Sequence, residues 1–208
     1  MDTQQAYNAW AAQYDTNNNK TRDLEAGSLR NILSSLSFNN CLEIGCGTGK
    51  NTAWLIEKAA HITAVDLSEA MLAKAKEKIT ADRVHFVQAD ITKPWTFATK
   101  QYDLVTFSLV LEHIEELEPV FAKASQSLCT GGYLYVGELH PFKQYTGSKA
   151  RFDTAEGVQV VTCYNHHLSD FMRAAKKHRL QVADIHEYFD NNNPNSIPRI
   201  LTMLFQKG

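Results

Sequence analysis

The chain has 208 residues, of which 44% are hydrophobic and 21% charged, and its formal net charge is −2. This length suits one well-buried core, and basic residues spread along the chain give no concentrated positive face for nucleic acid. No stretch reaches the length of a membrane span. The four cysteines have no CxxC spacing, which indicates reduced thiols in a cytoplasmic protein and no metal site.

Two kinds of apolar periodicity alternate along the chain and predict the elements of one α/β domain. Helices are predicted over 3–13, 21–36, 50–59, 70–79 and 117–128. Strands are predicted over 41–44, 62–65, 84–87, 103–107 and 133–137. Ser68 is expected to cap the fourth helix, and Gly131-Gly132 to end the fifth. Such alternation favours a mostly parallel, doubly wound sheet with a ligand crevice at the strand ends.

The most informative motif is the run Leu42–Gly49, in which the first strand ends in Gly45, Gly47 and Gly49. Glycine is needed where a strand turns sharply into a helix while its backbone passes close to a ligand. An adenosyl cofactor would lie on such a loop. Nicotinamide and flavin enzymes also use a Gly-x-Gly turn, so this motif alone leaves the cofactor open.

Two acidic residues end the next two strands. Asp66 lies 17 residues after Gly49, where a carboxylate can accept both hydroxyls of a ribose, in NAD or in an adenosyl sulfonium. Asp90 follows the third strand at the same edge of the sheet and can accept the exocyclic amine of adenine, with Ile91 packed on the ring. The reacting group would lie near Ser108 and His113, after the fourth strand.

The series Leu42–Gly49, Asp66, Asp90 and Tyr102–His113 resembles the successive motifs of the class I S-adenosylmethionine (SAM)-dependent methyltransferases. The closest resemblance is to the bacterial group that contains the ubiquinone/menaquinone-type and other small-molecule methyltransferases, and it is specific over about 38–139. It implies a Rossmann-like seven-stranded sheet of order 3-2-1-4-5-7-6 with the last strand antiparallel. The tail, 181–188 and 199–205, would form the closing hairpin.

The resemblance also implies a role for individual residues. The three glycines would approach the methionine portion of SAM, and Glu43 would lie beneath their loop. The other implied cofactor contacts are Tyr14, Asp66, Leu67, Asp90, Ile91 and Ser108. Lys50 in place of a further glycine, and about 37 residues before the first strand, favour SAM over NAD.

Two segments are expected to flank the cofactor. Residues 1–37 resemble the helical lid of the same group, and aromatic residues at positions 7, 10 and 14 share one helical face, where they cover the cofactor or pack in the core. An insertion over 140–167 is expected to face the acceptor, with Tyr7, Arg151 and His167 as binding residues. Aromatic walls with a few polar groups suit a compact metabolite.

Methyl transfer is an in-line displacement that depends mainly on positioning. A general base is needed only for a protonated nucleophile, and His140 and then His113 are the candidates, because a histidine at a strand end can accept a proton. The predicted function is therefore transfer of a methyl group from SAM, leaving S-adenosylhomocysteine, to a small molecule, by a monomer or homodimer. An NAD-dependent oxidoreductase and a non-catalytic module that binds SAM or its product are the alternatives.

Overall fold

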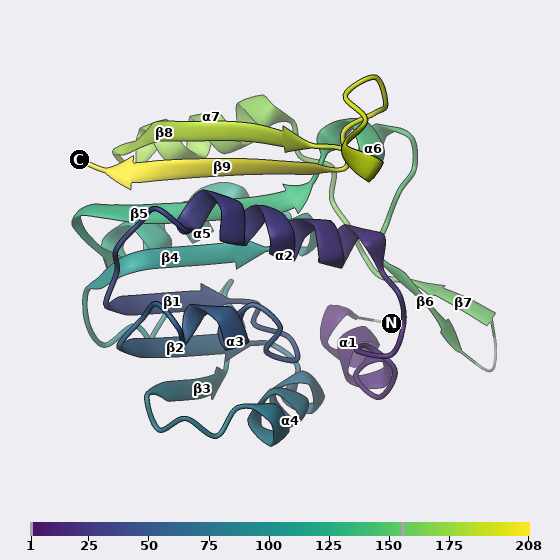
Figure 1. Ribbon diagram of the computed structural model, residues 1–208, viewed down its shortest axis with the longest axis horizontal. Helices are drawn as coiled ribbons and strands as arrows, with labels where there is room; N and C mark the ends of the chain where they lie inside the picture. Colours follow the sequence, from purple (N-terminus) through teal and green to yellow (C-terminus); the bar gives the residue numbers. More distant parts are fainter. Residues whose placement is uncertain (1, 155–156) are drawn as a thin grey trace.

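A seven-stranded sheet forms the centre of the computed structural model, which describes residues 2–154 and 157–208 (Figure 1). The strand order is β3-β2-β1-β4-β5-β9-β8, and β9 runs antiparallel to both of its neighbours. With the separate hairpin β6–β7 set aside, this is the predicted order 3-2-1-4-5-7-6, so the predicted fold class is confirmed. The strands of the sheet are β1 (Asn40–Ile44), β2 (His61–Asp66), β3 (Val84–Gln88), β4 (Tyr102–Ser108), β5 (Leu128–Leu139), β8 (Leu180–Tyr188) and β9 (Ile200–Lys207).

The central strands β1, β2 and β4 are buried with little alternation because helices cover both of their faces. Leu42 on β1 pairs with Thr63 on β2 and Val105 on β4, and both Leu42 and Val105 are fully buried. This register brings the carboxyl ends of β1, β2 and β4 to the same edge of the sheet.

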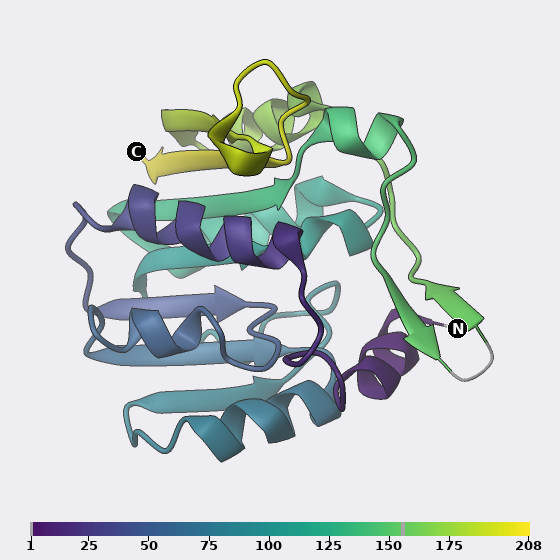
Figure 2. The same cartoon turned by 45° about the vertical axis from the view of Figure 1, so that its right-hand side comes forward.

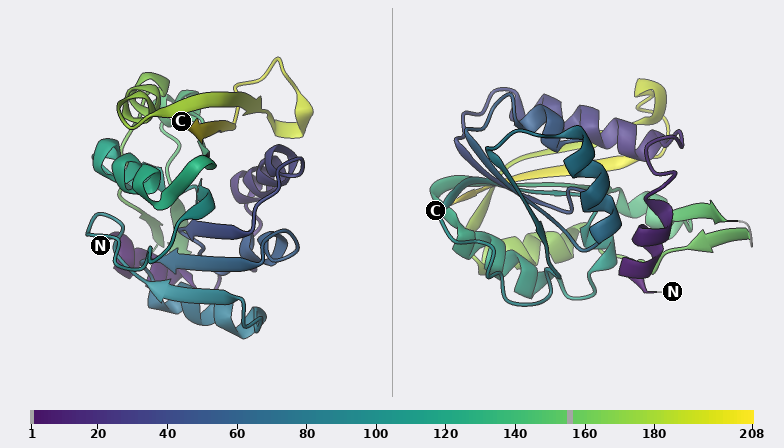
Figure 3. Two further views of the ribbon diagram at one scale, coloured as in Figure 1. Left: turned by 90° about the vertical axis from the view of Figure 1, so that its left-hand side faces the viewer. Right: turned by 90° about the horizontal axis from the view of Figure 1, so that it is seen from below.

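Helices form a layer on each side of the sheet (Figure 3). On one side lie α2 (Lys20–Leu33), α3 (Thr52–Leu55) and α4 (Glu69–Lys78), whose Leu29, Leu55 and Leu72 share one apolar cluster with the sheet. On the other side lie α5 (Leu117–Ser127) and α7 (Leu168–Lys177), which contribute to a second cluster. Two apolar clusters thus enclose the sheet as a doubly wound fold requires.

Local signals set several of the element boundaries. The hydroxyl of Ser68 accepts the N–H of Met71, so Ser68 caps α4 as predicted. The helix α5 ends at Ser127, before the glycine pair: Gly131, with φ +79°, lies within β5 where its pairing with β4 is irregular. The expectation that these glycines stop the helix was therefore wrong, since the chain enters β5 directly.

The elements at the carboxyl edge of the sheet come from distant parts of the chain (Figures 1 and 2). They are α1 (Thr3–Trp10) and the hairpin of β6 (Arg151–Thr154) and β7 (Gly157–Val160). Trp10 stacks on Phe152 with ring centroids 5.1 Å apart, and both side chains are buried. Of the segment 1–37, α1 thus borders this edge, whereas α2 packs on the sheet face beside β5 and β9.

Three short elements lie in the connections between the longer helices and strands. They are η1 (Leu111–His113) after β4, α6 (Pro141–Tyr145) after β5 and η2 (Asp190–Asn192) before β9. Among the described residues, no helix combines the length and apolar character needed to cross a bilayer.

Candidate functional site

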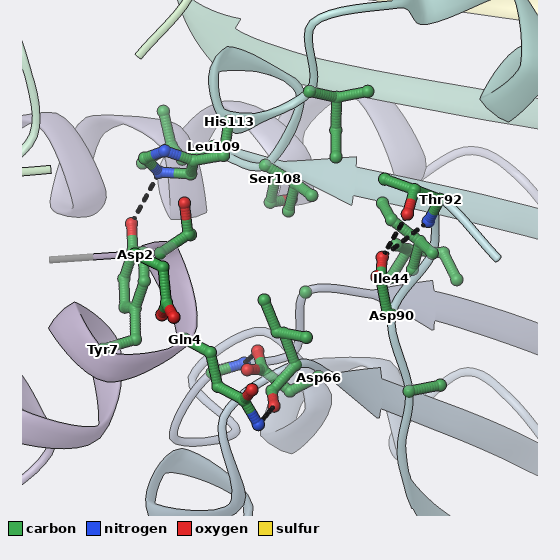
Figure 4. A pocket seen from close by; sticks show the side chains of 18 of the residues that line it. Asp2, Gln4, Tyr7, Ile44, Asp66, Asp90, Thr92, Ser108, Leu109 and His113 are labelled. Atoms are coloured by element: carbon green, nitrogen blue, oxygen red, sulfur yellow. Dashed lines mark hydrogen bonds between the residues drawn. The ribbon is translucent and has the colours of Figure 1, made fainter. Parts of the chain in front are cut away.

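A cavity of about 390 Å³ opens at the carboxyl ends of the parallel strands (Figure 4). Residues that follow β1, β2, β3 and β4 line it, and α1 closes it from outside. In a doubly wound sheet this is the edge at which ligands bind. Ten of the predicted site residues line this cavity: Tyr7, Tyr14, Gly45, Gly47, Asp66, Leu67, Asp90, Ile91, Ser108 and His113.

The three glycines of the loop after β1 have positive φ, but they face different surroundings. A Cβ at Gly45 would lie 2.1 Å from Cγ2 of Val110, and one at Gly49 would lie 2.8 Å from Cδ1 of Ile79. A Cβ at Gly47 would have no atom within 4 Å, although Gly47 lines the cavity. Gly47 therefore leaves room for a ligand, whereas Gly49 permits close packing against α4 and does not line the cavity.

Asp66 joins the glycine loop to the end of β2. Its Oδ2 accepts the N–H of Gly47 at 2.8 Å, and its Oδ1 accepts the N–H of Ser68 at 2.8 Å. Burial raises the pKa of Asp66, and the two backbone N–H groups oppose this shift. Because each carboxylate oxygen has a second lone pair, Asp66 can accept further hydrogen bonds from a ligand that lies in the cavity.

Asp90 lies across the cavity from Tyr7 in Figure 4, at the turn that follows β3. Its Oδ1 accepts both the N–H and the hydroxyl of Thr92, at 2.9 and 2.7 Å. The ammonium of Lys123 donates to the carbonyl oxygens of Ile91 and Thr92, which fixes the turn from the α5 side. Ile91 is buried beside this carboxylate and lines the cavity. The pair thus offers a hydrogen-bond acceptor next to an apolar surface.

Glu43 lies on β1, directly before the glycine loop, and it is not among the residues that line the cavity. Its carboxylate is buried and accepts the hydroxyl of Thr52, the first residue of α3, at 2.5 Å. Burial raises the pKa of Glu43 to about 8. Glu43 therefore supports the loop.

Tyr7 and His113 meet at the opposite side of the cavity. The hydroxyl of Tyr7 lies 2.8 Å from Nε2 of His113, and Nδ1 of His113 lies 2.8 Å from the carbonyl oxygen of Thr162. A carbonyl can only accept, so Nδ1 carries the proton and Nε2 accepts the tyrosine hydroxyl. Burial raises the pKa of Tyr7 well above its ordinary value, which keeps the phenol protonated.

Arg151 lines a second cavity, of about 260 Å³, which adjoins the first. Tyr7, Tyr14 and Leu109 line both. Leu109 has a left-handed φ of +56°, an unusual conformation for a branched residue, and its N–H donates to the carbonyl of Gly137. This conformation places Leu109 at the boundary between the two cavities.

The structure does not bring His140 or His167 to either cavity. The side chain of His140 caps α6 through Nδ1, which accepts the N–H of Phe142, and its Nε2 lies 2.9 Å from the carboxylate of Glu187. Nδ1 of His167 lies 2.6 Å from the hydroxyl of Tyr145. Tyr145 and Glu187, the partners of the two histidines, lie at the surface. Both histidines therefore take part in local packing and capping.

Sequence reasoning missed two residues that shape the first cavity. The side-chain nitrogen of Gln4 donates to the carbonyl of Leu67 and fastens α1 to the end of β2. Buried Glu138 accepts the N–H groups of Val110 and Leu111 and so fixes the turn that contains Leu109. Both contacts join segments distant in sequence, and no local pattern distinguishes them. A glutamate in an otherwise apolar strand, 133–139, was the one available signal.

Glu112, His113 and Cys163 place one donor atom each within 4.8 Å of one another. Both nitrogens of His113 are engaged, with Tyr7 and with Thr162. Burial raises the pKa of Cys163 to about 12, so the thiol stays protonated. Since metal binding needs a thiolate and a free imidazole nitrogen, these contacts do not favour a metal ion here.

Residues 42–136 match the family model described as a methyltransferase domain. A malonyl-[acyl-carrier protein] O-methyltransferase from Priestia megaterium is 37% identical over 133 residues, which cover 62% of this chain and 47% of that protein. The chain spans about half the length of the first curated relatives it matches.

Solved structures resemble the whole chain in fold. The N-methyltransferase NodS from Bradyrhizobium japonicum WM9, in complex with S-adenosylhomocysteine, has a TM-score of 0.75 at 18% identity, covering 100% of this chain and 99% of NodS. A SAM-dependent methyltransferase from Clostridium acetobutylicum has a TM-score of 0.73 at 20% identity, covering 97% and 99%. The chain therefore has the fold of these SAM-dependent methyltransferases, and its residues 42–136 match a methyltransferase domain.

Proposed function

We propose that this chain transfers a methyl group from SAM to a small-molecule acceptor. The observation that carries the proposal is the first cavity, in which the open face of Gly47, the carboxylate of Asp66 and the carboxylate of Asp90 follow three adjacent strands. One adenosyl group can contact all three, because ribose hydroxyls and an adenine amine both donate to carboxylates.

Each part of the cavity suits one part of the cofactor. Gly45 and Gly47 approach the methionine portion, Asp66 accepts the ribose hydroxyls, and Asp90 with Ile91 receives the adenine. Leu67, Ser108 and Tyr14 complete the wall. Glu43 supports the loop through Thr52, and Gly49 permits the packing of the loop on α4.

When bound, SAM supplies a methyl carbon on which the acceptor's electron pair forms a bond as the bond to sulfur breaks and leaves its pair on sulfur. The residues of this chain position the acceptor in line with that methyl, and positioning alone lowers the barrier by several kcal/mol. Tyr7 lines both cavities, and His113 lies beside it in the wall of the first. If the acceptor atom carries a proton, Nε2 of His113 is the group that receives it, directly or through the tyrosine hydroxyl.

We also propose that the chain acts as one domain in which α1 serves as a lid and the 140–167 segment faces the acceptor. Gln4 and Tyr7 support the first role, since they contact the end of β2 and His113 across the cavity. Arg151 supports the second, because it lines the adjoining cavity. A cytoplasmic monomer or homodimer without a nucleic-acid partner is part of this proposal, and four free cysteines agree with a reducing compartment.

Two experiments test the function. Thermal unfolding with SAM, S-adenosylhomocysteine or NAD should show a raised melting temperature with the first two only. Incubation with SAM labelled in the methyl group and a metabolite extract should then give a labelled small molecule, identified by mass spectrometry. Stabilisation by NAD would instead favour an oxidoreductase, and binding of SAM without any labelled product would favour a non-catalytic module.

A further inference from the structure

The second cavity lies beside the first, since three residues line both. Its volume of about 260 Å³ lies below the range of roughly 300–1,000 Å³ typical of pockets for drug-sized ligands. The residues that line it include Arg22, Lys149, Arg151 and Arg199, together with one carboxylic acid, Glu112. The cavity is therefore small and rich in positive charge.

Three of these four cations form no salt bridge with a described residue, although Arg22 lies near enough to Asp15 to lower the pKa of that carboxyl. Arg199 forms a two-point ion pair with Asp190, at 2.5 and 2.6 Å, and is thereby neutralised. No salt bridge involves Arg22, Lys149 or Arg151 within residues 2–154 and 157–208. The cavity thus has an excess of uncompensated positive charge.

Backbone carbonyl groups, and not a salt bridge, hold Arg22 in place. Its two terminal nitrogens donate to the carbonyl oxygens of Tyr14 and Asn17, and its guanidinium lies 3.9 Å from the centroid of the Tyr14 ring. Its Nε is buried and has no hydrogen-bond partner. A guanidinium that is fixed, partly desolvated and short of one partner is prepared to bind an anion.

The start of α2 adds to the positive potential. Asn19 caps this helix, and Asn19, Thr21 and Arg22 all line the second cavity. The N-terminus of a helix carries about half a positive charge, and basic side chains there are unfavourable. Two basic residues, Lys20 and Arg22, nevertheless occupy the first turn, together with Asp23, which pairs with Lys50. An anion in the cavity would reduce the electrostatic penalty of the two cations.

We infer that the second cavity binds the methyl acceptor and selects a small molecule that carries a carboxylate or phosphate group, held by Arg22, Lys149 and Arg151. This inference rests on the proposed function. Because Tyr7, Tyr14 and Leu109 line both cavities, an acceptor anchored there presents its other end to the first cavity. The buried carboxyl of Glu112 lies in the same wall, and burial raises its pKa, which reduces its repulsion of an anion.

Direct binding tests the inference without turnover. Protein loaded with S-adenosylhomocysteine is titrated calorimetrically with malonate, with inorganic phosphate and with malonamide, which has the shape of malonate but no charge. We expect one or both anions to bind and malonamide not to bind. Comparison of the affinities for malonate and phosphate shows whether the site prefers a carboxylate or a phosphate. Added salt should weaken anion binding, since it screens the partly exposed cations.

Substitutions locate the binding site. Lys149 and Arg151 have exposed side chains, so Lys149→Ala and Arg151→Ala should leave the fold intact. Each substitution should lower the affinity for the more tightly bound anion at least about 10-fold, as expected for loss of a charge-assisted hydrogen bond. Arg173→Ala is the matched control, because Arg173 is 76% exposed on α7 and lines neither of the two cavities. All three variants should bind S-adenosylhomocysteine as the wild type does.

Three results would overturn the inference: no binding of either anion, equal binding of malonate and malonamide, or equal losses in Arg151→Ala and Arg173→Ala. The methyl-transfer assay provides an independent check once a labelled product is known. Arg151→Ala should then raise the KM of the acceptor and change kcat little, since the anchor acts on binding. If the acceptor is neutral and its KM is unchanged in Arg151→Ala, the inference is overturned and the proposed methyltransferase activity remains in place.

Discussion

Asp66 has the most direct role proposed for a single residue, because its carboxylate would accept both ribose hydroxyls while it holds the N–H groups of Gly47 and Ser68. Asp66→Ala should weaken the binding free energy of SAM by roughly 2–4 kcal/mol, the loss expected for two hydrogen bonds to a charged acceptor. Isothermal titration calorimetry measures this change. An unchanged affinity for SAM would remove the assignment of the cofactor site.

A conservative variant separates the direct contact from support of the loop. In Asp66→Asn one oxygen remains and can still accept a backbone N–H group. We expect an intermediate affinity for SAM and a melting temperature closer to that of the wild type than in Asp66→Ala. If Asn restores full affinity, the charge of Asp66 makes no contribution to binding.

Gly47 provides a steric test of the same site. Gly47→Val should abolish SAM binding, because its side chain would enter the open space of the cavity. The φ of +54° also makes any branched residue costly here. Gly131→Val is the matched control, since Gly131 has φ +79° and equally open surroundings but lies outside the cavity. Calorimetry should show SAM binding in the control and none in Gly47→Val, with both melting temperatures lowered.

At the scale of elements, α1 and the turn after it contribute both to the core and to the wall of the first cavity. Trp10 is buried against Phe152, whereas Tyr7 on α1 and Tyr14 in the following turn line the cavity. The aromatic face predicted from the sequence therefore serves core packing and the cavity together. A helix of eight residues has little stability of its own, so these contacts fix its position.

Hydrogen exchange tests whether α1 acts as a lid. Amide exchange over residues 7–15 should slow when S-adenosylhomocysteine is added, because a bound ligand fills the space beneath Tyr7 and Tyr14 and stabilises the closed position. Exchange in the second half of α2, around Leu29 and Leu33, should change little, since those side chains are already buried in the apolar cluster on the sheet. Equal exchange over 7–15 with and without ligand would identify α1 as permanent core.

For the whole molecule, burial of carboxyl groups should make stability depend on pH. Burial raises the pKa of Glu25 to about 7 and those of Glu43 and Glu138 to about 8. The folded protein therefore binds more protons than the unfolded chain between the ordinary value of 4.5 and about 8. By linkage, their stabilising contribution is complete below 4.5 and is lost as the pH rises through 8, so the free energy of unfolding falls across this range.

Urea unfolding at several pH values checks this expectation. Glu138→Gln should flatten the decline, because the amide oxygen can accept the N–H groups of Val110 and Leu111 without titrating. Glu118→Gln is the control: Glu118 is exposed, and Lys177 lowers its pKa, so its titration lies below the range tested. A decline equally steep in Glu138→Gln and in the wild type would contradict a contribution from Glu138.

The sequence by itself determined the alternation of strands and helices, and its motifs indicated the family, from which the sheet order followed. These signals are local: apolar periodicity, glycines at sharp turns, and acidic residues immediately after strands such as Asp66 and Asp90. Element ends were less well determined, as at Gly131, because competing turn and strand geometries differ little in the local sequence.

Only the tertiary structure decided which polar side chains face a cavity. His140 and His113 both follow strands, yet one caps α6 and the other meets Tyr7 beside the first cavity. Likewise, Arg22 resembled an ordinary charged residue of a helix until the fold brought it beside Lys149 and Arg151. Contacts between residues more than a hundred positions apart depend on the packing of whole elements, and packing is a property that no local pattern encodes.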